Sequence, residues 1–182
     1  MLLFVKPFFL TKNDVLSLLK ELDAVLEKSL EIYIIGGANL IAQGFIQRAT
    51  HDIDVILPPQ FSEDVLRQIS HIANEHHIEK NWINTMPSRD ALFLSKDWQE
   101  RSILFYKGKK LSAFLLGRKD IIGMKLAATI DRGRDAEDLL AMEPTDEEWE
   151  FGRKWARAYD GHSDWADLID KLVAQLKKKQ HA

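Results

Sequence analysis

The 182-residue sequence contains no cysteine, which excludes disulfide bonds, zinc–thiolate centres and cysteine nucleophiles. It also lacks any apolar run near the ~18–20 residues that a membrane span needs. The apolar N-terminus, residues 1–7, is short and has neither a basic leader nor a small-residue cleavage site, so we expect no signal peptide and a cytoplasmic protein. Neither sign of charge dominates, since the formal net charge is −3. The molecule as a whole therefore has no general electrostatic attraction to nucleic acid.

The residues that are present suit a globular domain, with 46% hydrophobic and 29% charged residues. Apolar stripes at helical spacing alternate with strand-like runs up to residue 116, and Thr11 and Ser62 each stand in front of a stripe as the predicted helix cap. The predicted strands are residues 31–35, 51–57, 91–94, 102–106 and 111–116, the last two joined as a hairpin. From residue 117 onward the patterns are helical. We therefore predict an α/β fold, an α+β mixed sheet with helices packed on it, over residues 1–116, and a helical C-terminal subdomain over residues 117–182.

Two acidic residues stand at the head of the predicted strand 51–57. Asp52 and Asp54 are two residues apart, so their side chains project from one face of the strand. At a separation of about 6–7 Å the two negative charges repel by roughly 2–3 kcal/mol. A hard divalent cation, Mg²⁺ above all, relieves this repulsion because it prefers carboxylate and phosphate oxygens. The alternative is a solvated strand edge, where acidic residues are common.

A glycine pair, Gly36-Gly37, ends the preceding strand and is followed by a largely apolar run, residues 38–46, that predicts a helix. Glycine lets the backbone approach a ligand closely, and exposed N–H groups at a helix start bind phosphate. The two segments together offer phosphate donors and a metal-binding acid pair. Nucleoside triphosphate chemistry requires that combination.

The order of these features, a glycine pair, a short helix and then Arg48-Ala49-Thr50-His51-Asp52-Ile53-Asp54, resembles the signature of the nucleotidyltransferase superfamily. Its fold is of the DNA polymerase β type. Within it, the chain looks similar to small prokaryotic proteins related to abortive-infection and toxin–antitoxin nucleotidyltransferases. The resemblance implies a nucleotidyltransferase core over residues 1–116.

The resemblance also implies roles for individual residues. Asp52 and Asp54 would be catalytic residues and metal ligands, and Gly36 and Gly37 would bind the β and γ phosphates. Two further residues would flank the phosphates or only orient the loop, namely Arg48 and Thr50. The family pattern often adds a third carboxylate on a later strand, and the candidate strand 111–116 contains no acid.

A second block of the family pattern is similar to residues 125–139. Lys125 lies in an apolar helical run, where a lysine is seldom fully buried without an anionic partner. The resemblance implies that Lys125 is catalytic and binds nucleotide, stabilising charge on the triphosphate or contacting a core carboxylate. It implies that Asp135 belongs to the nucleotide site, caps the next helix and pairs with Lys125 or Arg132; helix capping alone also explains Asp135.

A shorter stretch, Trp82-Ile83-Asn84, is similar to one that borders the pocket in the same relatives. The alternative is a core tryptophan beside a turn. Three histidines, His71, His76 and His77, do not have the spacing of a convergent metal site.

These features imply a Mg²⁺-dependent nucleotidyltransferase that binds ATP or another nucleoside triphosphate and transfers a nucleoside monophosphate to a hydroxyl acceptor. The toxin relatives favour tRNA as acceptor and a toxin–antitoxin or phage-defence role. Residues 107–134 carry eight Lys and Arg against two Asp, which suits a polyanionic acceptor or, alternatively, a solvated face. The second hypothesis is a non-catalytic nucleotide-binding or antitoxin-like interaction protein of the same fold.

Overall fold

A computed structural model describes residues 9–87, 90, 94–133 and 135–181. Its described residues form two compact units, one drawn from Met1–Ala91 and Ser102–Leu116 and the other from Leu92–Arg101 and Gly117–Ala182. Most of the predicted strand 91–94 lies outside the described residues, and Leu94 itself is in a bend. The mixed α/β fold predicted from the sequence is confirmed.

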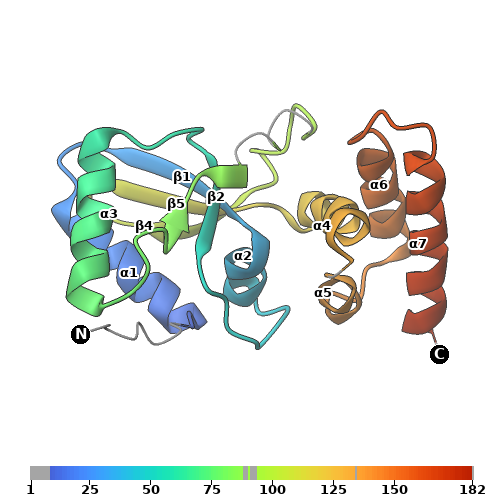
Figure 1. Ribbon diagram of the computed structural model, residues 1–182, viewed down its shortest axis with the longest axis horizontal. Helices are drawn as coiled ribbons and strands as arrows, with labels where there is room; N and C mark the ends of the chain where they lie inside the picture. Colours follow the sequence, from blue (N-terminus) through green and yellow to red (C-terminus); the bar gives the residue numbers. More distant parts are fainter. Residues whose placement is uncertain (1–8, 88–89, 91–93, 134, 182) are drawn as a thin grey trace, which may run out of the picture. The chain divides into compact units, whose positions relative to one another are not determined.

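The first unit contains a five-stranded sheet with strand order β3-β2-β1-β5-β4 (Figure 1). Strand β1 pairs antiparallel with β2 and parallel with β5, whereas β2 pairs parallel with β3 and β4 antiparallel with β5. The strands are β1 (Leu30–Ile35), β2 (Ile53–Leu57), β3 (Ile83–Asn84), β4 (Ile103–Lys107) and β5 (Leu111–Leu115). The predicted hairpin is confirmed, whereas the two-residue strand β3 was not predicted.

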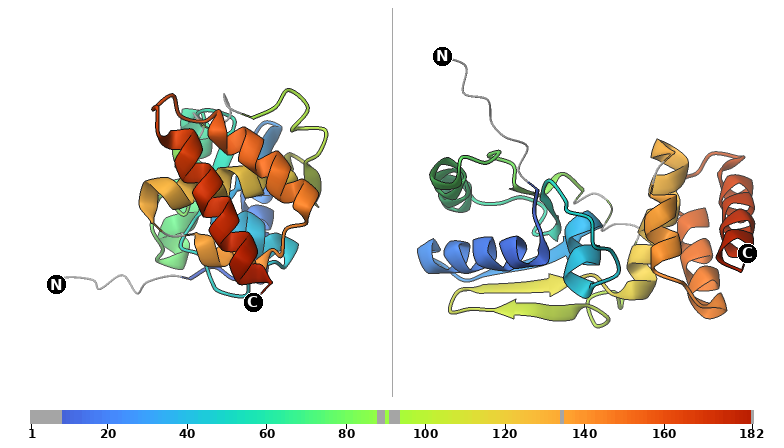
Figure 2. Two further views of the ribbon diagram at one scale, coloured as in Figure 1. Left: turned by 90° about the vertical axis from the view of Figure 1, so that its right-hand side faces the viewer. Right: turned by 90° about the horizontal axis from the view of Figure 1, so that it is seen from below.

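Three helices belong to this unit: α1 (Lys12–Val25), α2 (Gly36–Gln43) and α3 (Glu63–His76). The side chains of Thr11 and Ser62 cap α1 and α3 as the sequence predicts, because each accepts a backbone N–H that has no partner in the first turn. Helices α1 and α3 form one layer against the sheet (Figures 1 and 2). Their apolar stripes pack on the same sheet face in one core, which includes Leu19, Ile69, Ile32, Ile53 and Val55.

The second unit contains four helices, α4 (Arg118–Arg132), α5 (Ala136–Ala141), α6 (Asp146–Arg157) and α7 (Trp165–Gln180). Helices α4 and α6 cross closely, since a Cβ atom on Gly123 would lie 2.8 Å from the ring of Trp155. Trp149 and Trp155 are buried in the core of this unit. In the described part of the chain, no helix has the length and apolar character needed to cross a membrane.

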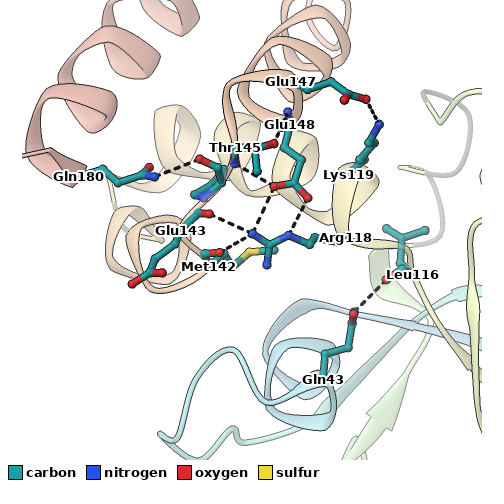
Figure 3. A network of polar contacts seen from close by, with 11 residues as sticks. Gln43, Leu116, Arg118, Lys119, Met142, Glu143, Thr145, Glu147, Glu148 and Gln180 are labelled. Atoms are coloured by element: carbon teal, nitrogen blue, oxygen red, sulfur yellow. Dashed lines mark hydrogen bonds and ion pairs between the residues drawn. The ribbon is translucent and has the colours of Figure 1, made fainter.

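A polar network joins the start of α4 to the loop before α6 and to α6 itself (Figure 3). Arg118 donates to Glu148 through Nε, at 2.6 Å from Oε1, and also to the backbone oxygens of Met142 and Glu143. Lys119 forms a more exposed ion pair with Glu147. Arg118 therefore satisfies carbonyl groups at the end of α5 as well as a side chain of α6.

Candidate functional site

The two aspartates of the central motif lie at the start of β2. Ile53 and Val55 point into the helix-covered core, so Asp54 projects from the opposite face of the sheet. Asn84 on the neighbouring strand β3 has its amide nitrogen 3.2 Å from Oδ1 of Asp54 and 3.5 Å from Oδ2 of Asp52. One amide group thus lies within reach of both carboxylates, which places the two acids on one side of the strand.

The glycine pair lies directly against this motif. In the β1–β2 register, Ile35 is opposite Asp54, so the next residue along, Gly36, turns away from the sheet beside that carboxylate. Gly36 has φ +66°, and a Cβ atom there would lie 2.7 Å from Oδ2 of Asp54. A Cβ atom on Gly37 would lie 2.8 Å from Oγ1 of Thr50. Both glycines are therefore required by close approach, and the first also by its backbone conformation.

Helix α2 starts at Gly36, and its N-cap, Ile35, provides no side-chain hydrogen bond to the first N–H groups. The buried Asn39 fixes the helix to the sheet, because its amide donates to the backbone oxygens of Ile34 at 2.8 Å and Leu116 at 3.1 Å. Gln43 donates to the same oxygen of Leu116 at 3.1 Å (Figure 3). The start of α2 is thus a rigid set of backbone donors beside two carboxylates, the arrangement that binds an anion such as phosphate.

The electrostatics of the acid pair favour a cation. Burial raises the pKa of Asp52, and the neighbouring charge of His51 offsets only part of this rise. A buried carboxylate that resists ionisation is stabilised in its charged form by a positive ion, and oxygen ligands of this kind suit Mg²⁺. The carboxylate oxygens of Asp52 and Asp54 therefore fit a divalent cation. Across the described residues, no group of three or more His, Cys, Asp or Glu side chains is placed so that it could hold a metal ion.

The other two motif residues lie on the loop between α2 and β2. Thr50 is buried, and its backbone pairs with that of Leu10, with the N–H of Thr50 3.1 Å from the oxygen of Leu10. The N-terminal segment thereby fixes the part of the loop that lies against Gly37. Arg48 is exposed on the same loop.

Lys125 and Asp135 lie together in the helical unit. The ammonium group of Lys125 on α4 is 2.5 Å from Oδ1 of Asp135 and 2.7 Å from Oδ2 of Asp138 on α5. Asp135 occupies the N-cap position of α5 with φ +82°, yet its side chain makes no capping hydrogen bond. The expected pairing of Asp135 with Lys125 is therefore present, and the expected side-chain cap is absent because the lysine engages the carboxylate instead.

Two residues have contacts at these sites that the sequence did not predict. Asp138 belongs to the block that is similar to the family pattern, where a brace to an arginine was the role expected of it, and its carboxylate completes the lysine cluster. Asn39 fixes the glycine helix, and the signal was a single amide within an apolar helical run. Asn84 was recognised only through the resemblance, and the structure places it at the acid pair.

A mixed sheet in which a glycine turn and helix start face two aspartates on the adjacent strand defines a nucleotidyltransferase-like α/β protein. The chain belongs to the family described as "Nucleotidyltransferase of unknown function (DUF6036)", whose model matches residues 13–171. No curated protein and no solved structure matches the chain. The matched span includes the glycine pair, the acid pair and the Lys125 cluster, so the suspected superfamily is confirmed and the general enzyme class follows from it.

Proposed function

We propose that the protein is a Mg²⁺-dependent enzyme that transfers a nucleoside monophosphate from a nucleoside triphosphate, with ATP the first to test, to a hydroxyl acceptor. The acceptor oxygen forms a bond to the α-phosphorus, the bond from that phosphorus to the bridging oxygen breaks, and pyrophosphate leaves. The proton of the hydroxyl group is released. Family membership supports the transferase class, and the cation, the nucleotide and the acceptor are our proposal.

One observation carries this proposal: Gly36 at the start of α2 lies against a carboxylate oxygen of Asp54. A phosphate bound by the first N–H groups of α2 would be next to two negative side chains, and such anions share a site only with a cation between them. Asp52 and Asp54 would hold Mg²⁺, which when bound neutralises charge on the triphosphate. Thr50 and Arg48 would support the phosphate end of the nucleotide.

We propose an RNA 3′ hydroxyl, that of tRNA first, as the acceptor. The β4–β5 hairpin presents Lys107, Lys109 and Lys110 around a hollow of about 290 Å³. In the parallel β1–β5 pair this hairpin lies at the Leu30 end, whereas Gly36 follows the other end. A five-residue strand spans roughly 17 Å, a distance that a short stretch of RNA backbone bridges. A toxin-like or phage-defence role would follow from modification of tRNA.

The test is label transfer by the purified full chain, incubated with Mg²⁺, total RNA and each triphosphate labelled at the α or the γ position. We expect label from the α position alone to enter RNA. The double variant Asp52→Asn with Asp54→Asn should abolish transfer, whereas Glu63→Gln with Asp64→Asn, which removes the same two charges from the first turn of α3, should not. Transfer that survives the double variant, or that carries the γ label, would refute the proposal.

A second candidate is supported by the absence of a third acid next to the pair among the described residues. In that case the protein binds Mg²⁺ and nucleotide without transferring it, or acts as an antitoxin-like partner of another protein. Nucleotide binding that depends on Asp52 and Asp54, with no transfer to any RNA, would favour the binding role. A stoichiometric partner that co-purifies regardless of nucleotide would favour the interaction role.

A further inference from the structure

Asn84 is held at the acid pair by the short strand β3. Its position in the sheet is directly opposite Asp54 in the parallel β2–β3 pair. Trp82, two residues before Asn84, is fully buried, and its indole N–H donates to the backbone oxygen of Ile69 at 3.1 Å. The backbone oxygen of Trp82 accepts the N–H of Ile53 at 2.7 Å. The backbone of Asn84 is therefore fixed relative to the strand that carries both aspartates.

The orientation of the Asn84 amide is also fixed. Its oxygen accepts the backbone N–H of Met86 at 3.0 Å, so its nitrogen is the atom turned toward the aspartates. An amide nitrogen carries two N–H groups, and here one is available for Asp54 and one for Asp52, the second at the longer distance of 3.5 Å. Asp54 consequently has Oδ1 toward Asn84 and Oδ2 toward Gly36.

This arrangement has an electrostatic consequence. The amide offsets part of the repulsion between the two carboxylates without adding a third negative charge. An acid at the same place would add that charge and a further oxygen ligand. Since cation affinity rises with the number of charged ligands, a site with two carboxylates binds Mg²⁺ weakly by itself and takes further oxygens from phosphates.

We propose that Asn84 is a positioning residue that holds Asp52 and Asp54 together by one amide, so that the site binds a divalent cation together with a nucleoside triphosphate and not alone. This inference rests on the proposed function. Under this proposal, the neutral residue Asn84 on β3 determines that the cation binds only together with the triphosphate.

The experiment measures Mn²⁺ binding to the full chain by electron paramagnetic resonance, with and without the non-transferable analogue α,β-methylene-ATP. We expect wild-type protein to bind Mn²⁺ at least about tenfold more tightly with the analogue than without it, because the phosphates supply the missing oxygens. Asn84→Asp should bind Mn²⁺ alone at least about tenfold more tightly than wild type, because it supplies a third carboxylate.

Asn74→Asp makes the same chemical change at an exposed position on α3 and should leave Mn²⁺ binding unchanged. Asn84→Leu removes both donors at similar volume and should weaken binding of Mn²⁺ with the analogue by roughly tenfold. Circular dichroism and thermal unfolding check that each variant is folded. If Asn84→Leu fails to fold, the comparison of Asn84→Asp with Asn74→Asp still decides the matter.

The inference is overturned if wild-type protein binds Mn²⁺ equally with and without the analogue, or if Asn84→Asp binds it no better than Asn74→Asp. Failure of the proposed function has a different signature. In that case wild-type protein shows no binding of Mn²⁺ with the analogue that depends on Asp52 and Asp54. Binding that depends on the two aspartates but is insensitive to Asn84 refutes only the positioning role.

Discussion

Gly36 is required for two reasons, its backbone conformation and its close approach to Asp54. Its φ of +66° is costly for any other residue, by about 1–2 kcal/mol, and its missing Cβ leaves room for Oδ2 of Asp54. We expect Gly36→Ala to lower the free energy of unfolding by about that amount. It should also weaken binding of Mn²⁺ with α,β-methylene-ATP more than tenfold, because the methyl group displaces a proposed cation ligand.

Gly44 provides the matched control for this substitution. It ends the same helix with φ +83°, and a Cβ atom there would meet nothing within 4 Å. Gly44→Ala should therefore cost similar stability, measured by denaturant unfolding, and leave nucleotide binding unchanged. Equal losses of binding in the two variants would show that the contact with Asp54 is irrelevant.

Asp52 gives the cation-free protein a defined pH dependence. Because burial raises the pKa of Asp52, the folded protein retains this proton to higher pH than the unfolded chain does. The free energy of unfolding should therefore fall as pH rises from the ordinary aspartate pKa through the raised one, and remain lower above it. Asp52→Asn, which cannot ionise, should lack this fall and be more stable than wild type above the window.

Denaturant unfolding across a pH series, in buffers that contain a chelator, measures this difference. Asp64→Asn on the exposed side of α3 is the control. Saturating Mg²⁺ together with α,β-methylene-ATP should reverse the order above the raised pKa, because a cation bound by the ionised carboxylate stabilises the wild type more than Asp52→Asn. Parallel pH profiles for wild type and Asp52→Asn would contradict the expectation.

Among the helices and strands, those features could be predicted that depend on residues close together in the sequence. The caps at Thr11 and Ser62 were predicted because a hydroxyl group next to an apolar helical stripe acts within one turn. Strand β3 was not predicted because two residues are too short to show an alternating pattern. Its place beside β2 is set by sheet pairing and by the burial of Trp82, which are long-range effects.

The residue that accompanies the acid pair is likewise set by long-range pairing of strands. The sequence pointed to the strand at residues 111–116, and the structure puts β5 on the other side of β1 from the acid pair. The strand that borders β2 on the side away from β1 is β3, which carries Asn84. Residue types and spacing thus predicted the glycine and aspartate segments, whereas strand order determined which third side chain accompanies them.

The contact between α4 and α5 depends on one buried cation. Replacing Lys125 by Met would leave Asp135 and Asp138 without their shared ammonium group in a buried setting. We expect Lys125→Met to lower the free energy of unfolding by about 3–5 kcal/mol. The role on the triphosphate that the sequence resemblance implies for Lys125 is tested separately, by transfer activity per folded molecule, which a purely structural role would leave unchanged.

Arg118 and Lys119 are adjacent residues with different environments (Figure 3). Arg118 bonds to a half-buried carboxylate of Glu148 and to two backbone oxygens, whereas Lys119 pairs with the exposed Glu147. We expect Arg118→Met to cost about 2–3 kcal/mol of stability and Lys119→Met less than about 0.5 kcal/mol. Thermal unfolding of the two variants measures both, and similar losses would contradict the assignment of the network to Arg118.

At the scale of the whole molecule, the small net charge conceals a local concentration of lysines. The overall charge of −3 predicts no attraction to RNA, yet the β4–β5 hairpin concentrates lysines. Two of them are engaged with the protein, since Lys107 donates to Oγ of Ser112 at 2.8 Å and Lys110 to the backbone oxygen of Leu26. Lys109 donates its backbone N–H to Asp23 at 3.0 Å, and in the described part of the chain no hydrogen bond from its ammonium group is found, so this ammonium group is the one best able to contact a phosphate.

If RNA is the acceptor, Lys109 should contribute one phosphate contact to its binding. Lys109→Gln should then lower the slope of log affinity against log salt concentration by about 0.7–0.9 and weaken tRNA binding regardless of sequence. Lys12→Gln, which removes the same charge from an exposed position on α1, should leave the slope unchanged. Filter binding over a salt series measures both variants. Equal slopes would remove the hairpin from the proposed acceptor site without affecting the proposed cation and nucleotide site, because α2 and β2 would bind those ligands at the other end of the β1–β5 pair.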